Sequence, residues 1–445
     1  MDSKFFSPLD INHAVMACRG EGVYITDDNG KRYLDGSSGA MTVSLGHNNK
    51  EITDAVKNQL DLLAFTYRSQ FTNEPLEELC REISSLAPGD LEYVSLANSG
   101  SEAAELAMKM AYSYWTSRRL PMKRRIISRW SSYHGSTVGA LSMSGNAARR
   151  REYSPYVSDF PVLELPFCHL CPYEKKPSDC NLFCANHLQT LLNRFGAENV
   201  SAVICEPITG ASGAGITPPE DYFHRIQEIC RKNEVLLIMD EVITGFGRTG
   251  KYFASEHWDI VPDIIVFGKG ITSGYFPLAG IIVRRDIHDC IEEKGIKFIT
   301  GHTFGGNPLA CASAIATIEF MKSRNIVKEA AEKGVLLKKK LHELADRCTI
   351  ISDIRGKGLL WGVEFAKERT GIELFTPENN ITGKIVKACF ERGLIVYPSA
   401  GFIDGKHGDS VLLSPPLTIT EKEIEHLAAL LEASIHDVET NMSCE

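Results

Sequence analysis

One lysine of the chain stands where a buried strand is expected to end. In the stretch PDIIVFGKGITSGYFPLAG, an apolar run over residues 264–267 precedes Lys269, which lies between Gly268 and Gly270. A desolvated amine is a good nucleophile toward carbonyl groups, and the flanking glycines allow other groups to approach it closely. A single lysine of this kind is more often a solvated strand end, so its charged neighbours decide the interpretation.

Two further apolar segments end in acidic residues. The stretch AVICE leads to Glu206, and LLIMDE ends at Asp240 and Glu241. In open α/β sheets, ligands gather at the carboxyl ends of the strands, so these carboxylates are expected near Lys269. Three charged strand ends along one edge favour a site in which the lysine amine is the nucleophile.

A fourth segment contains a possible anion site. The stretch YVSLANSGSEAAELA reads as a strand, a Ser/Gly turn and a helix, in which residues 99–102 match the capping box. The N–H groups of such a helix start can also hold a phosphate, although capping alone is the commoner explanation. The stretch is neither a Walker loop nor a dinucleotide fingerprint, so a nucleotide is not the predicted ligand. A lysine nucleophile, an acid and a phosphate site are together what pyridoxal phosphate (PLP) requires.

The elements that would position these residues alternate between strands and helices. Apolar runs at intervals of about 30 residues indicate βαβ units and a mostly parallel sheet that is covered on both faces. We expect an N-terminal segment (1–55), a large domain (56–320) and a small C-terminal α+β domain (321–445). A hairpin around Asp28-Asn29-Gly30 is expected to pack with the C-terminal domain. The final stretch, ETNMSCE, is expected to be disordered.

Composition excludes several classes of function. The chain has 445 residues, of which 43% are hydrophobic, and its 48 basic and 57 acidic residues give a net charge of −9. This charge argues against nucleic acids and anionic membranes as partners. The N-terminus lacks the pattern of a signal peptide, and no run is long enough to span a membrane. We therefore expect a soluble, cytoplasmic protein.

The motifs resemble those of a known family. The chain resembles the class III aminotransferases, of the ornithine/4-aminobutyrate type, over residues 20–435. The matching stretches are YLDGSSG, NSGSEA, YHGST, EPITGASG, LLIMDEVITGFGRTG, PDIIVFGKG, GGNPLA, RGKGLLWGVE and SPPLTIT. The resemblance implies PLP fold type I, an α/β fold with a mostly parallel central sheet in a large domain and a smaller α+β domain.

The resemblance also implies roles for individual residues. Lys269 would form the Schiff base with PLP and carry the proton, and Asp240 would pair with the pyridine nitrogen. The other implied cofactor contacts are Gly100 and Ser101 at the phosphate, Tyr133 and Val242 on the two ring faces, His134 beside Tyr133, Glu206 near the ring hydroxyl or the substrate, and Thr303 from the neighbouring subunit. No metal is implied in catalysis.

The implied activity is a PLP-dependent aminotransferase with a ping-pong mechanism. An amine or ω-amino acid would donate the amino group, and a 2-oxo acid, pyruvate or 2-oxoglutarate, would accept it. Because Thr303 would reach the neighbouring subunit's cofactor, a homodimer with the active site at its interface is expected.

The chain departs from the family at its usual carboxylate-binding arginines. Leu412, in DSVLLSPPL, stands where relatives carry an arginine before PPL, and Tyr397 stands at an earlier arginine position. A guanidinium suits a carboxylate and these side chains do not, which speaks against ornithine, acetylornithine and 4-aminobutyrate as donors. Arg68 is a candidate for the carboxylate contact, although an exposed helical arginine explains it as well. Arg355, in RGKG, is interpreted as structural.

Four of the 13 cysteines form a cluster in CHLCPYEKKPSDCNLFC. The C-x2-C and C-x3-C pairs of Cys168, Cys171, Cys180 and Cys184, with His169 and His187 nearby, could hold zinc. The spacing between the pairs is short for usual zinc patterns, so reduced, packed thiols are the favoured interpretation. A disulfide is disfavoured in a reducing compartment.

Two other functions use the same residues differently. An aminomutase or an amino-acid racemase would employ Lys269 and Asp240 but retain the amine on the product. Alternatively, the chain could be a catalytically inactive scaffold that binds metal or senses redox state. The complete set of Lys269, Asp240 and Gly100 argues against this second alternative.

Overall fold

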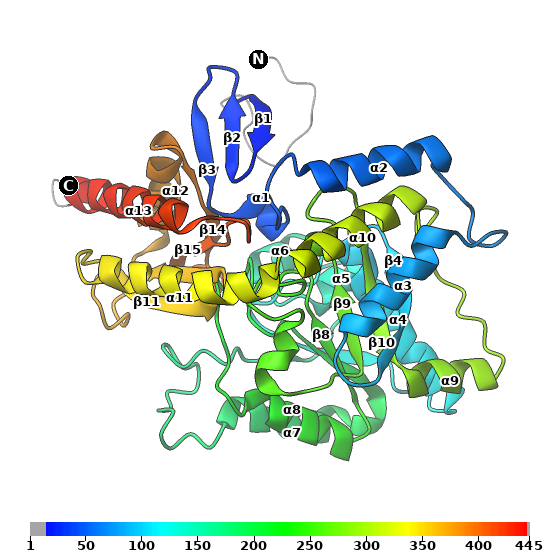
Figure 1. Ribbon diagram of the computed structural model, residues 1–445. Coiled ribbons are helices and arrows are strands. Elements are labelled where there is room, and N and C mark those ends of the chain that lie inside the picture. The colour runs from blue at the N-terminus through cyan, green and yellow to red at the C-terminus, as the bar shows by residue number, and fades with distance from the viewer. Residues whose placement is uncertain (1–14, 443–445) are drawn as a thin grey trace.

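The computed structural model describes residues 15–442, and these form three sheets with surrounding helices (Figure 1). The first 14 residues of the expected N-terminal segment lie outside this range. Within the described residues, no helix has both the length and the apolar composition that crossing a membrane requires.

The central sheet has seven strands in the order β4-β10-β9-β8-β7-β5-β6. Their bounds are Leu91–Ala97 (β4), Arg125–Arg129 (β5), Val162–Leu163 (β6), Val200–Cys205 (β7), Leu236–Asp240 (β8), Ile264–Phe267 (β9) and Ala279–Arg284 (β10). Strands β6, β5, β7, β8 and β9 are parallel, while β10 runs antiparallel to both β9 and β4. The mostly parallel sheet expected from the βαβ pattern is confirmed.

Alternate side chains of the central strands enter two different cores. Along β8, Leu237 and Met239 join one apolar cluster, whereas Leu236 and Ile238 join the other. This is the twofold alternation of a strand whose faces are both covered, and it explains why every residue of β7, β8 and β9 is buried.

Helices cover both faces of this sheet (Figure 1). Side chains of α4 and α9 belong to one cluster, while those of α3, α7, α8 and α10 belong to the other. The helices of this region are α1 (Ser38–Met41), α2 (Lys50–Leu62), α3 (Glu74–Leu86), α4 (Gly100–Ser117), α5 (Val138–Met143), α6 (Ala147–Glu152), α7 (Phe183–Phe195), α8 (Tyr222–Lys232), α9 (Arg285–Glu293) and α10 (Pro308–Ser323).

The C-terminal unit contains a four-stranded antiparallel sheet in the order β11-β12-β15-β14. Its elements are α11 (Ile326–Ala345), β11 (Ile351–Lys357), β12 (Leu360–Phe365), α12 (Ile381–Glu391), β14 (Tyr397–Ala400), β15 (Asp409–Leu413) and α13 (Glu421–Met442). Helix α13 includes residues 439–442, so disorder was wrongly predicted for that part of the tail. Residues 443–445 lie outside the described range.

The N-terminal strands form a hairpin that joins the C-terminal unit. Strands β1 (Ala17–Glu21), β2 (Tyr24–Asp27) and β3 (Arg32–Asp35) are antiparallel, and β3 pairs in parallel with β13 (Leu394–Ile395). The carboxylate of Asp27 accepts hydrogen bonds from the N–H groups of Asn29 and Lys31, and Gly30 has a φ of 81°. These features confirm the predicted turn, while the domain boundaries themselves remain a prediction.

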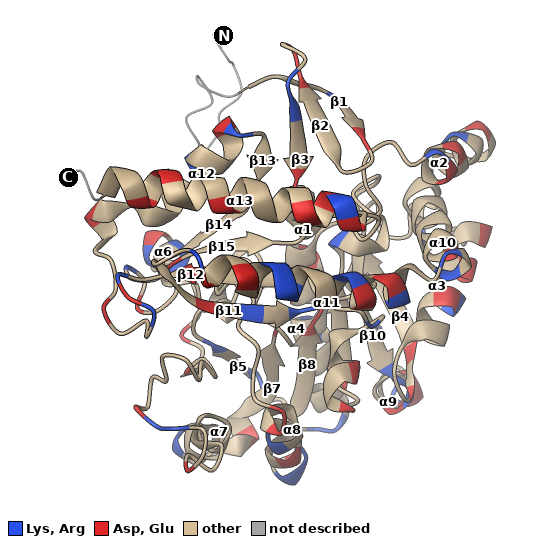
Figure 2. Cartoon of the chain, turned by 60° about the vertical axis from the view of Figure 1, so that its left-hand side comes forward, with Lys and Arg blue, Asp and Glu red and all other residues tan. Residues whose placement is uncertain are grey.

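Charged side chains of both signs are interspersed along α11, whereas those of α13 are acidic apart from Lys422 in its first turn (Figure 2). On α11, Lys333 pairs with Glu329 at 2.8 Å, one helical turn away. Leu337 and Leu341 on the same helix are fully buried. The segment is therefore the charged amphipathic helix expected from its sequence.

Candidate active site

Lys269, Asp240 and Glu206 meet because three neighbouring strands are parallel. Asp240 is the last residue of β8, and its register partner on β9 is Val266, three positions before Lys269. Glu206 follows the last residue of β7, the next strand. The carboxyl ends of these strands thus bring the three charged side chains to one edge of the sheet, as predicted from the sequence.

The Lys269 amine lies in a setting that favours its neutral form. The side chain is half-buried, and burial lowers its pKa to about 8, although the carboxylates of Asp240 and Glu206 act in the opposite direction. The backbone of Lys269 has a φ of +44°, a region that residues with a Cβ rarely adopt. Strain of this kind is typical of residues held in place for function.

The carboxylate of Asp240 is held by two partners. Its Oδ2 lies 2.6 Å from Nδ1 of His134, and its Oδ1 accepts a hydrogen bond from the N–H of Val242 at 3.1 Å. Both His134 and Asp240 are buried, and Nε2 of His134 has no hydrogen-bond partner in the described residues. A buried carboxylate beside an unsatisfied imidazole nitrogen is an environment prepared for a polar ligand.

Glu206 fixes the loop that carries Tyr133. Its Oε2 accepts a hydrogen bond from the N–H of Tyr133 at 3.1 Å, and its Oε1 accepts one from the N–H of Gly210 at 3.0 Å. Burial raises the pKa of Glu206, as does its proximity to Asp240, whereas His134 lowers it. Glu206 therefore positions Tyr133 relative to Asp240. Glu241, by contrast, binds the backbone N–H of Ser255 and is structural.

The start of α4 is capped as the sequence predicted, and phosphate binding there remains a prediction. Ser99 caps the helix by accepting a hydrogen bond from the N–H of Glu102, whose carboxylate accepts one from the N–H of Asn98. The Oγ of Ser101 accepts a hydrogen bond from the N–H of Ser136 at 3.0 Å. This last contact places the helix start beside the loop of Tyr133 and His134.

Gly100 and Val242 are close neighbours. A Cβ added to Gly100 would lie 3.2 Å from Cγ1 of Val242, and one added to Gly268 would lie 3.4 Å from the same atom. Gly268, which precedes Lys269, therefore permits close packing of the start of α4, the segment after β8 and the segment after β9. Val242 is consequently placed between the helix start and the lysine-bearing strand.

These residues fit PLP on three observations. The lysine amine has a lowered pKa, the buried Asp240 has one imidazole partner, and a capped helix start lies next to them. These are the features that an aldehyde, a pyridine nitrogen and a phosphate group need.

Thr303 stands apart from this cluster. It is exposed in the loop between α9 and α10, and no hydrogen bond links its side chain to another described residue. Arg68 donates a hydrogen bond from Nη2 to the carbonyl oxygen of Thr300 at 2.8 Å, and so holds this loop. Thr303 and the role of Arg68 toward a carboxylate remain predictions.

The two positions that lack arginine lie side by side. Tyr397 on β14 pairs directly with Leu412 on β15, and Leu412 is fully buried. Arg355 forms an ion pair with the buried Glu364 and donates a hydrogen bond to the carbonyl oxygen of Ala214. Its structural interpretation is therefore consistent with these contacts.

The four clustered cysteines are free thiols that line one small cavity. Burial raises the pKa of Cys168 and of Cys184, and the neighbouring thiols add to both shifts. In the described part of the chain, the only three potential metal ligands whose atoms all lie within 4.8 Å of one another are elsewhere, at Cys348, His436 and Glu439. Cys168 is exposed and the other three are partly exposed, so reduced, packed thiols remain a prediction for the cluster.

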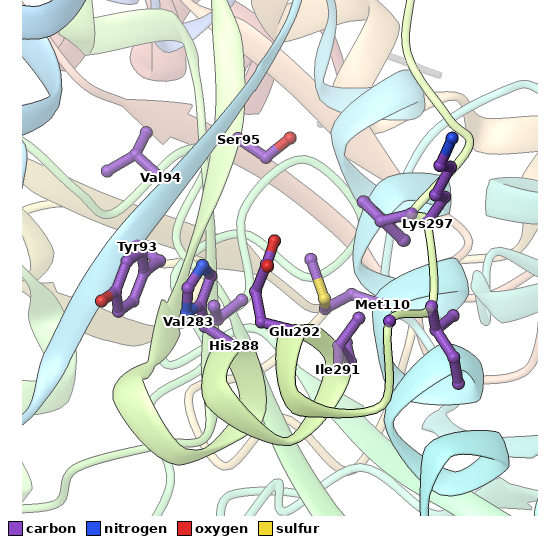
Figure 3. Close-up of a pocket in the computed structure, with 12 residues that line it drawn as sticks. Tyr93, Val94, Ser95, Met110, Val283, His288, Ile291, Glu292 and Lys297 are labelled. Atoms are coloured by element: carbon purple, nitrogen blue, oxygen red, sulfur yellow. The ribbon is translucent and has the colours of Figure 1, made fainter.

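The pocket beside the edge strand β4 is not this site. It has a volume of about 510 Å³ and is lined by residues of β4, α4, β10 and α9 and by the loop 295–298. Figure 3 shows Tyr93 and His288 at this pocket, and their rings are parallel with centroids 3.5 Å apart. None of the residues expected to contact PLP lines it.

The chain is similar to known proteins in both sequence and fold. The family model described as aminotransferase class-III matches residues 7–435. Aminotransferase YodT of Bacillus subtilis is 42% identical over 95% of each chain. Putrescine–pyruvate aminotransferase of Pseudomonas aeruginosa is 34% identical over 96% of this chain and 91% of its own. A PLP-bound amine transaminase from an uncultivated Pseudomonas species has a TM-score of 0.92, with 31% identity over 98% of this chain and 99% of its own.

Proposed function

The chain belongs to the class III aminotransferase family, whose cofactor is PLP, and we propose that it moves an amino group from an amine or ω-amino acid to a 2-oxo acid. The observation that carries the proposal is the convergence of Lys269, Asp240 and His134 at the ends of parallel strands. Pyruvate or 2-oxoglutarate is the proposed acceptor. The relative from Pseudomonas aeruginosa, named for putrescine and pyruvate, supports an amine donor and a 2-oxo acid acceptor.

The residues present would hold PLP in the manner expected from the sequence. Gly100 and Ser101 at the start of α4 would bind the phosphate, and Thr303 would reach it from a second subunit. Tyr133 and Val242 would contact the two ring faces, while His134 and Glu206 would line the ring edge. When bound, PLP supplies the carbonyl that takes up the amino group and the ring that withdraws electrons from the substrate.

Lys269 would act first as a nucleophile and then as a base. With a pKa of about 8, roughly a tenth of the amine is neutral at pH 7, far more than for an ordinary lysine, and this fraction is available for attack on a carbonyl. Once an incoming amine displaces Lys269, the free Nζ would accept the proton from the substrate carbon. In the second half-reaction, Nζ would donate a proton to the carbon of the 2-oxo acid that receives the amino group. Both tasks require the neutral amine, which the partial burial of Lys269 favours.

Asp240 would hold a proton at the pyridine nitrogen. Because His134 and the N–H of Val242 occupy its two oxygens from the protein side, the carboxylate has a fixed orientation before any ligand binds. A charge that is oriented in advance stabilises the transition state more than a charge that must reorient during the reaction.

A homodimer would complete the site. Several large apolar side chains near the Thr303 loop are exposed in the single chain, among them Leu62 (80%), Phe71 (65%), Ile299 (90%) and Phe304 (57%). Phe65 packs edge-on against Phe304, which joins residues 60–71 to this loop in one surface. Exposed large apolar side chains that gather in one region are typical of a protein interface, and a second copy of the chain is the partner that would bring Thr303 to the phosphate.

A half-reaction assay tests the proposed function. The purified PLP enzyme is mixed with an amine donor alone, and its absorbance spectrum is followed; a 2-oxo acid is then added. An aminotransferase loses the band of the lysine-bound cofactor with the donor and regains it with the 2-oxo acid. An aminomutase or racemase would return the amine to its product and retain the band. Retention with every donor in a panel of amines, diamines and ω-amino acids would overturn the proposal.

A further inference from the structure

A 2-oxo acid brings a carboxylate to a site whose fixed charges include two acids. Glu206 and Asp240 are both buried next to Lys269, so a cation other than the reacting lysine is required to attract the substrate anion. Tyr397 and Leu412, which are paired on adjacent strands, provide none. The question is which cation faces this side of the cluster.

Most arginines near the cluster are already engaged. Their guanidinium groups donate hydrogen bonds to backbone carbonyl oxygens: Arg129 to Glu206, Arg248 to Pro415 and Arg150 to Ser142 and Ser144. Arg129 and Arg248 are also almost completely buried, so protein atoms enclose their guanidinium groups. Arg150 would have to break two hydrogen bonds to reach a substrate. These three residues therefore support the fold around the site.

Arg149 differs from them. It lies on the short helix α6, is exposed, and its guanidinium makes no hydrogen bond or ion pair with any residue between 15 and 442. Its guanidinium carbon lies 4.7 Å from the centre of the Tyr133 ring. The N–H of Tyr133 donates a hydrogen bond to Glu206. Tyr133 is therefore the single residue that connects Arg149 to the cluster of charged strand ends.

Tyr397 also lies within the electrostatic reach of Arg149. Burial raises the pKa of the Tyr397 phenol, Arg149 lowers it and Tyr133 raises it further. The guanidinium therefore lies over the Tyr133 ring and close enough to Tyr397 to affect its phenol electrostatically. Stacking on an aromatic ring orients the guanidinium plane and leaves its N–H fork open to a ligand.

We propose that Arg149 binds the carboxylate of the 2-oxo acid acceptor, and of donors that carry one, in place of an arginine at position 397 or 412. The guanidinium fork matches the two oxygens of a carboxylate, and no other group in the described chain competes for it. The substrates of this class share a carboxylate and a reacting carbon. An amine without a carboxylate would not use Arg149. The inference rests on the proposed aminotransferase function.

Steady-state kinetics with two kinds of substrate test this role. The variants are Arg149→Gln and Arg149→Lys, with Arg151→Gln as the matched control because it removes the same charge from the same exposed helix. The donor is a primary amine without a carboxylate, and the acceptor is pyruvate. We expect Arg149→Gln to raise the KM for pyruvate about ten- to a hundredfold, the loss associated with a hydrogen bond to a charged group. Arg149→Lys should raise the KM for pyruvate less than Arg149→Gln does, while the KM for the donor stays unchanged in both variants.

A binding measurement supplements the kinetics. Propionate, which carries the carboxylate but cannot accept an amine, should compete with pyruvate in the wild-type enzyme and lose affinity by a similar factor in Arg149→Gln. An unchanged KM for pyruvate in Arg149→Gln, or an equal rise in Arg151→Gln, would overturn the inference. Absence of the donor-induced spectral change in the wild-type enzyme would instead overturn the proposed function, so the two failures are separable.

Discussion

Nδ1 of His134 lies 2.6 Å from Oδ2 of Asp240, although 106 positions separate the two residues in the chain. The contact joins the loop after β5 to the end of β8, and both side chains are buried. The N–H of Val242 holds the other carboxylate oxygen. The acid that would meet the pyridine nitrogen is thus fixed by the protein alone.

Asp240→Asn should retain the fold but lower kcat by about a hundred- to a thousandfold, the scale on which losing one preorganised charge contact slows an enzyme. The amide cannot hold a proton at the ring nitrogen as a carboxylate does. Turnover of an amine with pyruvate measures this loss. Asp259→Asn is the matched control, since Asp259 is exposed and its left-handed backbone (φ of 47°) also suits asparagine. Comparable kcat values for the two variants would contradict the role of Asp240.

Capture of PLP by the cofactor-free protein should depend on pH in a way that reflects Lys269. Only the neutral amine attacks, so the rate rises as the pH passes through the amine pKa and levels off above it. With a pKa of about 8, the rise should fall between about pH 7 and 9. A lysine with the ordinary value of 10.5 would still gain rate at pH 10. Stopped-flow absorbance measures the rate, with Lys269→Ala as the control for capture by other amines.

Arg68→Ala should weaken PLP binding about three- to tenfold, the effect of losing one hydrogen bond. Arg68 holds the carbonyl oxygen of Thr300 at 2.8 Å, and this contact orders the loop that presents Thr303. If Arg68 acts through Thr303, the double variant with Thr303→Ala should bind PLP no more weakly than Thr303→Ala alone. Equilibrium dialysis provides the dissociation constants, and additive losses would show that the two residues act independently.

The cysteine cluster should contain thiols rather than zinc. Protein purified without a histidine tag should show less than one zinc per chain by elemental analysis. After unfolding without reductant, a thiol reagent should titrate the 13 cysteines of the chain. Among the described residues, no three of these thiols and the nearby histidines have ligand atoms within 4.8 Å of one another, as a zinc site requires. Stoichiometric zinc would contradict this prediction, and four thiols that fail to react would instead indicate disulfides.

The strand-end residues were predictable because their positions follow from topology. Lys269, Asp240 and Glu206 each terminate an apolar run, and parallel neighbouring strands must present such ends at one edge of the sheet. The capping pattern at Ser99 similarly predicted where α4 begins. In these cases, a local pattern together with one rule about sheets was sufficient.

The contacts between distant loops were not predictable in the same way. His134 was expected beside Tyr133, but its pairing with Asp240 depends on how the loop after β5 folds back, for which no periodic signal exists. Arg149 lies in a run of three arginines. Because the three residues are identical, the sequence does not show that Arg150 binds backbone carbonyls while Arg149 stacks on Tyr133. Side-chain direction on a six-residue helix is set by tertiary packing.

The most direct test of the account is to locate the cofactor on the chain. The PLP enzyme is reduced with borohydride, digested and analysed by tandem mass spectrometry, with Lys269→Ala treated in parallel. We expect one phosphopyridoxyl group per chain, attached to Lys269, and none in the variant. Attachment to a different lysine, or an equal yield from Lys269→Ala, would contradict this expectation.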